Sequence, residues 1–483
     1  MNKKFFSNTL WLISFQCVKM LISFVVSILT ARLLGPANYG IIGYVATFIT
    51  LFSPFANLGL TSVIVKEYVQ QKEESSTILK SCMAMCFISS AVCYILLNAI
   101  VFLLNINERI FLYCSLIQGL ILFCNCFELV TCYFQANLQS KKTVIISFIG
   151  YLTTQALKVL FLFTSKGVIW FSFACVIDSI TIAFLLLILT LRTPELRGGK
   201  LSKDIAKRCL KLSMPFILIG AISVIYASVD KLMIKHILGG TESVGYYNVA
   251  HSLATCWVFI VSAVITSFTP LIYESQLQDT KLHSTRIRQM YWAVFYIGAI
   301  ISLIISALCP FAIPVIYGNV YNQAILPTVF LTWASVFAYM GVARGVQFVC
   351  DKKQKYLLCF SCLTVIVNIA FNSVLIPIMG VSGAALATLI SEFFTCMICP
   401  LFFKETRKYS KDMSMSIAFQ GVQFRQLVAL AKSKLKHRKN SNNVKPDMEP
   451  ETENELVNCN EENIQDSANY VDMVTHKIEE EDN

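Results

Sequence analysis

Residues 28–49 of the chain have the sequence ILTARLLGPANYGIIGYVATFI, and residues 233–254 have the sequence MIKHILGGTESVGYYNVAHSLA. In each stretch an apolar run passes a basic residue, turns at a Leu-Gly pair and becomes apolar again after a second glycine. The paired glycines, offset by 204 and 205 residues, are Gly35 with Gly239 and Gly40 with Gly245. Because many polytopic membrane proteins are built from internal repeats, this pattern predicts a duplicated membrane unit.

The composition excludes a soluble globular protein. The 483 residues are 56% hydrophobic and 14% charged, and their mean hydropathy is +0.63. About twelve apolar runs are long enough to span a bilayer, where the backbone must satisfy its own hydrogen bonds as helices. The approximate spans are 9–31, 41–65, 81–104, 111–134, 144–164, 168–191, 212–234, 245–273, 291–316, 326–350, 356–377 and 383–403. We therefore predict an all-α polytopic membrane protein with about twelve transmembrane helices in two six-helix repeats.

The basic residues of the loops predict the orientation. The loops on one side of the predicted membrane carry 20 Lys and Arg residues, whereas the alternating loops carry only 4. Since cytoplasmic loops are enriched in Lys and Arg, both termini are expected in the cytoplasm. The first span has no small-residue cleavage site after it and is expected to be retained.

The hydrophobic pattern divides the chain into five segments. Two six-helix bundles are expected over residues 1–191 and 212–403, joined by a cytoplasmic linker over 192–211. Residues 404–439 form a basic juxtamembrane segment, in which 424–435 have the pattern of an amphipathic helix on the inner membrane surface. Residues 440–483 are acidic and nearly free of aromatics, which predicts a disordered cytoplasmic tail.

Neither the net charge nor the cysteines indicate a nucleic-acid or metal site. The net charge of +11 is largely explained by the basic cytoplasmic loops, so we predict no nucleic-acid partner. Most of the 18 cysteines lie within spans, where a reduced cysteine behaves as a small apolar residue. The CxxC pairs Cys359/Cys362 and Cys396/Cys399 lie on apolar helices, and we expect them to pack there without a metal. No cofactor is predicted.

Eight ionisable residues lie within the apolar runs. Insertion scales put each charge near the bilayer centre at about 2.5–3.5 kcal/mol, so most should face a bundle interior or a hydrated cavity. The candidate substrate-binding cations of the cavity are these basic residues together with Arg32 at the outer end of the first span: Lys19, Arg32, Lys158, Lys231 and Arg344. The candidates for ion coupling or interhelical pairing are Glu128, Asp178, Asp230 and Glu392.

Each of these charges also has a structural explanation. Lys158 and Lys231 are close enough to span ends to reach the interface, and the acids can form interhelical salt bridges. Lys19 is too far from either end for its ammonium group to reach water along the helix. A cavity-facing, anion-attracting role is therefore our hypothesis for Lys19.

The sequence contains no enzyme signature. It has no GxxxxGK[ST] phosphate loop, no HExxH and no GxSxG. The predicted outer loops of about five to ten residues are too short for an external catalytic domain. We therefore predict that the protein is not an enzyme.

The repeat is part of a wider resemblance, which extends over roughly residues 5–405. The matching stretches are TARLLGPANYG (30–40), ANLGLTSVIVKE (56–67), SVDKLMIKHILGGTESVGYYNVA (228–250) and VNIAFNSVLIPIMGVSGAALATLISE (367–392). With these stretches the chain resembles the polysaccharide (O-antigen type) flippases of the multidrug/oligosaccharidyl-lipid/polysaccharide exporter superfamily.

The resemblance implies two six-helix bundles that face each other in a V around a central cavity with alternating access. It implies a flippase that moves an undecaprenyl-pyrophosphate-linked oligosaccharide, an O-antigen or capsule repeat unit, to the periplasmic leaflet of the bacterial inner membrane. The expected partners are this substrate, membrane lipids, and the polysaccharide polymerase and glycosyltransferases. The long acidic tail departs from the family pattern.

Two alternatives remain open at this point. A cation-coupled drug or small-molecule antiporter of the same superfamily would centre its cavity on acids, and Asp178 and Glu392 are candidates for that role. Lys19 in the middle of the first span argues against such a cavity. The other alternative is a membrane scaffold for polysaccharide assembly that transports nothing.

Overall fold

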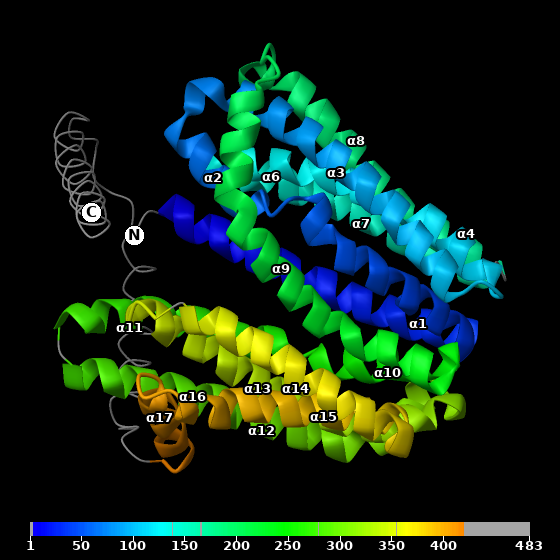
Figure 1. Ribbon diagram of the computed structural model, residues 1–483, viewed down its shortest axis with the longest axis vertical. Coiled ribbons are helices and arrows are strands. Elements are labelled where there is room, and N and C mark those ends of the chain that lie inside the picture. Colours follow the sequence, from blue (N-terminus) through cyan, green and yellow to red (C-terminus); the bar gives the residue numbers. More distant parts are fainter. Residues whose placement is uncertain (1–2, 138, 165–166, 279, 354, 420–483) are drawn as a thin grey trace, which may run out of the picture. The chain divides into compact units, whose positions relative to one another are not determined.

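The computed structural model describes residues 3–419 apart from 138, 165–166, 279 and 354 (Figure 1). These residues form helices and connecting turns, and no strand occurs among them. Eleven of their helical segments are long and apolar enough to cross a membrane, and the first of these, Val18–Gln70, contains a kink. The predictions of an all-α fold and of a multi-pass membrane protein are therefore confirmed.

The helices of the first half are α1 (Lys3–Ala56), α2 (Thr61–Gln70), η1 (Lys72–Glu74), α3 (Ser75–Leu104), α4 (Arg109–Gln118), α5 (Ile121–Cys124), η2 (Asn125–Phe127), α6 (Glu128–Ala136), α7 (Ser140–Phe163), α8 (Val168–Arg192) and η3 (Pro194–Leu196). Those of the second half are α9 (Lys203–Leu238), α10 (Thr241–Thr255), α11 (Val258–Gln278), α12 (Thr280–Ile316), η4 (Asn319–Ala324), α13 (Ile325–Cys350), α14 (Lys355–Met379), α15 (Val381–Phe393), the π-helix η5 (Phe394–Ile398), α16 (Cys399–Phe402) and α17 (Arg407–Ile417).

The two repeated glycine turns are confirmed. Gly35 has φ 74° and ψ 167°, and it divides α1 into two arms. Gly239 has φ 72° and ends α9. Both residues occupy the positive-φ region, which glycine enters at little cost because it has no Cβ. The expected loop after Gly35 is much shorter than the sequence suggested, because Pro36 already begins the second arm of α1.

The repeated segments pack against each other. The second arm of α1 contacts α10, and the two backbones meet at the second pair of repeated glycines. A Cβ at Gly40 would overlap the carbonyl group of Thr241, and a Cβ at Gly245 would overlap the backbone of Pro36. The glycines therefore permit a close helix crossing that any larger residue would prevent.

Further contacts join the two halves at the same end of the helices. The Lys235 Nζ atom at the end of α9 lies 3.0 Å from the Glu108 Oε1 atom before α4, and the lysine side chain is buried. The Tyr44 hydroxyl lies 3.0 Å from the His236 Nε2 atom. The Tyr321 hydroxyl donates to the Ala31 carbonyl oxygen at 2.6 Å. The structure is therefore closed between the halves at this end.

Helix α9 belongs to both halves. It contacts α2 and α3 near its beginning and α10 and α14 near its end, and Figure 1 shows it running between the two groups of helices. Of the predicted linker over 192–211, only residues 193–202 connect two long helices, and they include the short helix η3, because α8 ends at Arg192 and α9 begins at Lys203. The Ser202 hydroxyl accepts a hydrogen bond from the Ile205 amide at 3.4 Å and caps the helix.

Four predicted spans differ from uninterrupted helices. The run 41–65 is divided between α1 and α2, and the run 245–273 between α10 and α11. The run 111–134 is divided into α4, α5, η2 and α6. The run 383–403 contains the π-helix η5 between α15 and α16. A π-helix shifts backbone hydrogen bonds from the fourth to the fifth residue, which leaves carbonyl groups available to side chains.

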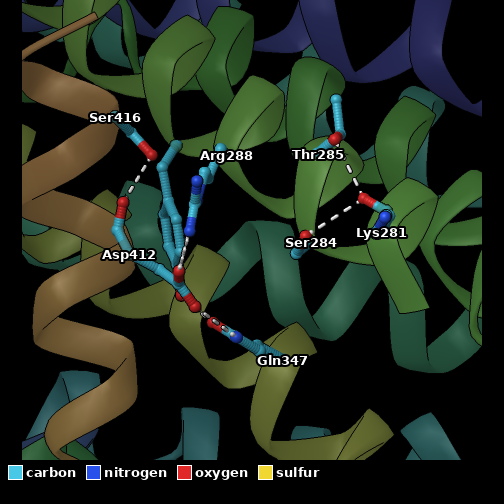
Figure 2. Close-up of polar contacts among 8 residues, drawn as sticks. Lys281, Ser284, Thr285, Arg288, Gln347, Asp412 and Ser416 are labelled. Atoms are coloured by element: carbon cyan, nitrogen blue, oxygen red, sulfur yellow. Dashed lines mark hydrogen bonds and ion pairs between the residues drawn. The ribbon is translucent and has the colours of Figure 1, made fainter. Parts of the chain in front are cut away.

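Helix α17 is docked on the second half through buried polar contacts. Asp412 is 4% exposed, and its Oδ1 atom lies 3.2 Å from the Arg288 guanidinium on α12. Its Oδ2 atom accepts a hydrogen bond from Gln347 on α13 at 3.4 Å. Figure 2 shows Asp412 between these two side chains.

A second polar contact also holds α17 in place. Burial raises the pKa of Tyr409, whose hydroxyl donates to Asp351 at 2.6 Å. The part of residues 404–439 that the structure describes is thus a packed helix.

The predicted amphipathic helix over 424–435 and the acidic tail over 440–483 lie outside the described residues.

Candidate functional site

A cavity of about 350 Å³ lies between the first arm of α1 and the end of α10. Its polar lining residues are Lys19, Ser23, Ser27, Ser252 and Thr255. Among the described residues that line it, none is acidic. An ammonium group surrounded by hydroxyl groups offers several hydrogen-bond donors, which suits an anionic ligand.

Lys19 is held at this cavity by the neighbouring helix α7. The Tyr151 hydroxyl donates to the Lys19 carbonyl oxygen at 2.9 Å, and the Lys19 ammonium lies 5.3 Å from the centroid of the Tyr151 ring. Asp178 on α8 lies within electrostatic reach of both Lys158 and Lys19. Of the two acids considered as salt-bridge partners of Lys19, Asp178 is therefore the one found near it.

Asp230 on α9 lies at the centre of a buried polar cluster. The side chain is 5% exposed. It accepts hydrogen bonds from the Asn372 amide at 2.6 Å, from the Thr388 hydroxyl at 2.8 Å and from the Tyr247 hydroxyl. The Asn372 amide also donates to Asn368 Oδ1 at 2.9 Å. Three helices, α10, α14 and α15, thus supply neutral donors to one carboxylate.

This arrangement leaves the charge of Asp230 without a close cation. The ion pairs found among the described residues do not include Asp230. A buried carboxylate can hold a proton or a small cation, and the Tyr247 and Thr388 hydroxyl oxygens that contact it are of the kind that small cations prefer as ligands. Lys231 lies within electrostatic reach of Asp230 but not in an ion pair with it. Adjacent residues of a helix point in different directions, which is why these two side chains form no ion pair.

Asp230 also lines a second cavity of about 200 Å³, together with Tyr226, His251 and Glu392. The Tyr226 hydroxyl donates a hydrogen bond to the Glu392 carboxylate. Both acids of the second half that were predicted within spans therefore face one space.

Arg344 lines a third cavity, of about 430 Å³, and is 5% exposed. Its Nη1 atom donates to the carbonyl oxygens of Thr395 at 2.7 Å and of Cys396 at 3.0 Å, both in the π-helix η5. The guanidinium also lies 4.7 Å from the centroid of the Phe360 ring. The irregular backbone of η5 therefore provides partners for a buried cation.

The three cavities adjoin one another. Thr255 lines both the first and the second cavity, and Tyr226, Ala338 and Glu392 line both the second and the third. Four residues of the sequence-predicted site line these neighbouring cavities: Lys19, Asp230, Glu392 and Arg344.

Two other predicted site residues, Arg32 and Glu128, lie elsewhere. Arg32 is exposed, and its guanidinium donates to the carbonyl oxygens of Val315 and Ile316 at 3.3 and 3.4 Å, at the end of α12. A cation at this position interacts favourably with the carbonyl end of a helix. Glu128 is exposed at the beginning of α6. Neither Arg32 nor Glu128 is among the residues that line the three cavities.

The polar residues around Asp230 and Lys19 were not predicted from the sequence. Asn368 and Asn372 carried a usable signal, because two amides four residues apart share one face of an otherwise apolar span. Both are fully buried. Tyr247 and Tyr151 carried no comparable signal, since a tyrosine in a span is also an ordinary packing residue.

A family model described as "Polysaccharide biosynthesis protein" matches residues 5–276, which is more than half of the chain. The chain belongs to the polysaccharide biosynthesis protein family. The match includes the first half with Lys19 and continues through α9 and α10 with Asp230. A search of curated proteins finds no significant match.

Solved structures show which fold this polysaccharide biosynthesis protein shares. An inward-facing multidrug resistance MATE transporter of the MOP superfamily is similar with a TM-score of 0.63 and 14% identity, over 82% of this chain and 95% of that one. The lipid II flippase MurJ in its inward closed conformation is similar with a TM-score of 0.61 and 15% identity, over 84% and 91%.

A third similar structure is a MOP superfamily transporter from Pyrococcus furiosus, whose binding pocket is described as having reverse polarity. Its TM-score is 0.56 at 13% identity, over 84% of this chain and 96% of that one. At such identities the likeness establishes the fold of this polysaccharide biosynthesis protein, and the chemistry of the site must come from its own residues.

Proposed function

We propose that the protein is a flippase for a lipid-linked oligosaccharide with an anionic diphosphate linkage. In this proposal the substrate is an undecaprenyl-pyrophosphate-linked O-antigen or capsule repeat unit, which moves from the cytoplasmic to the periplasmic leaflet of the bacterial inner membrane. Membership of the polysaccharide biosynthesis family supports the substrate class. The cavity that Lys19 shares with four hydroxyl groups is the observation that carries the proposal.

The physical reason lies in the cost of a charge in the membrane. An ammonium at mid-span costs about 2.5–3.5 kcal/mol unless water or an anion meets it. Asp178 meets part of this requirement, but it lies within reach of Lys158 as well as Lys19, so two cations share one acid. A diphosphate would supply the remaining negative charge and accept hydrogen bonds from the serine and threonine hydroxyls.

The contacts between the halves support alternating access as the proposed mechanism. With the orientation predicted from the loop charges, the Gly40–Gly245 crossing and the Lys235–Glu108 ion pair lie at the periplasmic end. The state described here would then be closed to the periplasm, and export requires these contacts to separate. Asp230 is the proposed coupling site, where binding of a proton or a cation would favour one state over the other.

A second candidate is a cation-coupled antiporter for drugs or other small molecules. The observation that favours it is the pair of acids, Asp230 and Glu392, which line one cavity and could attract a cationic substrate. The two functions make opposite demands on the Lys19 cavity, because an ammonium there attracts anions and repels cationic drugs.

Reconstitution of the purified protein distinguishes the two candidates. We expect proteoliposomes to translocate a fluorescent undecaprenyl-pyrophosphate oligosaccharide at a rate well above that of protein-free vesicles, and to show no uptake of a cationic dye. The matched control is undecaprenol carrying no phosphate, which should stay in its leaflet. Dye uptake without translocation of the diphosphate lipid would replace the flippase by the antiporter.

Reporter fusions test the proposed orientation. The difference of 20 against 4 basic loop residues predicts that fusions after Lys72, Lys203 and Lys353 report cytoplasm. Fusions after Asn107 and Gly318 should report periplasm, since both residues lie in turns at the opposite ends of their helices. A single fusion with clearly inverted activity would contradict the proposed topology and the direction of export.

A further inference from the structure

A fourth cavity, of about 410 Å³, lies entirely within the first half and shares no lining residue with the three cavities described above. It is formed where several helices end or begin: η1 and α3, the turn between α6 and α7, and the turn from α8 into η3. Its cationic lining residues are Lys72, Lys142 and Arg192, and its acidic one is Glu195. Three cations against one carboxylate leave an excess of positive charge around an open space.

The cations are exposed at the rim of this cavity. The ion pairs found in the described part of the chain include none of the three. Lys142 is positioned by two contacts, a hydrogen bond from Nζ to the Gln139 Oε1 atom at 2.8 Å and a Phe134 ring whose centroid lies 5.6 Å away. Neither contact neutralises its charge, so the ammonium can still bind an anion.

The rest of the lining combines polar side chains with two buried aromatic residues. Tyr133 and Phe134 are 8% and 1% exposed, so they pack behind the cavity and present little ring surface to it. Asn137 and Gln139 add side-chain amides. The cations and side-chain amides around this opening can donate hydrogen bonds to phosphate oxygens.

The position of the cavity along the membrane-spanning helices also favours a phosphate ligand. α6 ends at Ala136, α8 ends at Arg192, and α3 and α7 begin at Ser75 and Ser140. Apolar segments that end here leave the cavity at the depth of lipid headgroups. The N-terminal amides of the long helices α3 and α7 add partial positive charge on this side.

We infer that this cavity binds a phosphate-bearing anion at the membrane surface, independently of the proposed transport activity. The phosphate can come from the headgroup of an anionic phospholipid or from a free phosphate in solution, and both would use Lys72, Lys142 and Arg192. Basic pockets at the ends of transmembrane helices are suited to anionic headgroups because each cation adds attraction to the leaflet surface.

Native mass spectrometry of the full-length protein in detergent tests this inference. The protein is titrated with phosphatidylglycerol, and the triple variant Lys72→Gln/Lys142→Gln/Arg192→Gln is compared with the wild type. We expect each lost cation to weaken binding about five-fold, so that the triple variant retains little lipid. A matched control, Lys200→Gln/Lys203→Gln/Lys207→Gln, removes three exposed cations from outside the cavity and should bind like the wild type.

Two further arms identify the source of the phosphate and check specificity. Displacement of phosphatidylglycerol by millimolar inorganic phosphate would assign the site to free phosphate, whereas resistance would assign it to the lipid. Zwitterionic phosphatidylcholine should bind no more tightly to the wild type than to the triple variant. Thermal unfolding of both triple variants checks that they are folded, which is expected because the substituted side chains are exposed. The inference would be overturned if the triple variant bound phosphatidylglycerol and phosphate as tightly as the wild type. It would also be overturned if the control variant lost as much binding as the triple variant.

Discussion

Lys19→Ala should reduce export of the lipid-linked oligosaccharide about ten- to a hundred-fold while the protein still inserts at normal abundance. A charge-assisted hydrogen bond to a phosphate contributes about 1.5–3 kcal/mol, which corresponds to such a change in rate. Lys19→Arg should retain part of the activity, because the positive charge remains while the shape of the donor changes. The measurement is complementation of a surface-polysaccharide defect, with the amount of protein in the membrane determined beside it.

A purely structural role for Lys19 predicts a different outcome. Lys19→Ala would then leave Lys158 as the one remaining cation near Asp178 and would lower the amount of folded protein. The double variant Lys19→Ala/Asp178→Asn should restore that amount. The matched control is Lys158→Ala, which removes the other cation near Asp178 but does not alter the lining of the Lys19 cavity. Normal export by Lys19→Ala at normal abundance would remove Lys19 from the substrate site.

Asp230→Asn should abolish coupled transport and leave the fold nearly unchanged. Asparagine keeps the volume of the side chain and one acceptor oxygen for Asn372, while the hydroxyls of Tyr247 and Thr388 can rotate to accept from its amide. What is lost is the negative charge that would hold a proton or a cation. In proteoliposomes the wild type should respond to a pH or sodium gradient, and Asp230→Asn should not.

Two controls separate coupling from stability. Asp230→Leu removes the acceptor of the Tyr247 hydroxyl and of one Asn372 amide hydrogen, whereas the Thr388 hydroxyl can still donate to the Ala384 carbonyl oxygen. At about 1–3 kcal/mol for each unsatisfied group, this variant should have a markedly lower melting temperature. Asp204→Asn removes an exposed acid at the beginning of the same helix and should change neither property. If Asp230→Asn transports with the gradient dependence of the wild type, Asp230 is a structural residue.

The conformation of the repeated turns could be predicted from the sequence because it depends on local chemistry. At Gly35 and Gly239 the chain takes a positive φ, which only glycine adopts at little cost, and the flanking runs must be helical in lipid. The interruption at η5 was not predicted, because Phe394–Ile398 has no proline or glycine that would mark a break. A π-helix is favoured there by what it contacts, including Arg344.

The candidate site was predictable only in part. A charge in an apolar run is visible in the sequence, and its cost indicates that it faces a partner or a cavity. The sequence alone does not say which charges share a cavity. Arg32 and Lys19 lie on the same helix, yet Arg32 contacts the end of α12 and Lys19 lines a cavity with α10.

By itself the sequence determined that this chain crosses the membrane as helices and that it turns at Gly35 and Gly239, because bilayer thickness and glycine geometry act on local sequence. The tertiary structure alone decided that Asp230 meets Asn372, Thr388 and Tyr247 from three other helices. When a helix is apolar on nearly every face, the periodicity of its sequence does not predict which face packs against the other helices. The rotation of each helix is set by close packing, as where Gly40 and Gly245 let α1 and α10 touch.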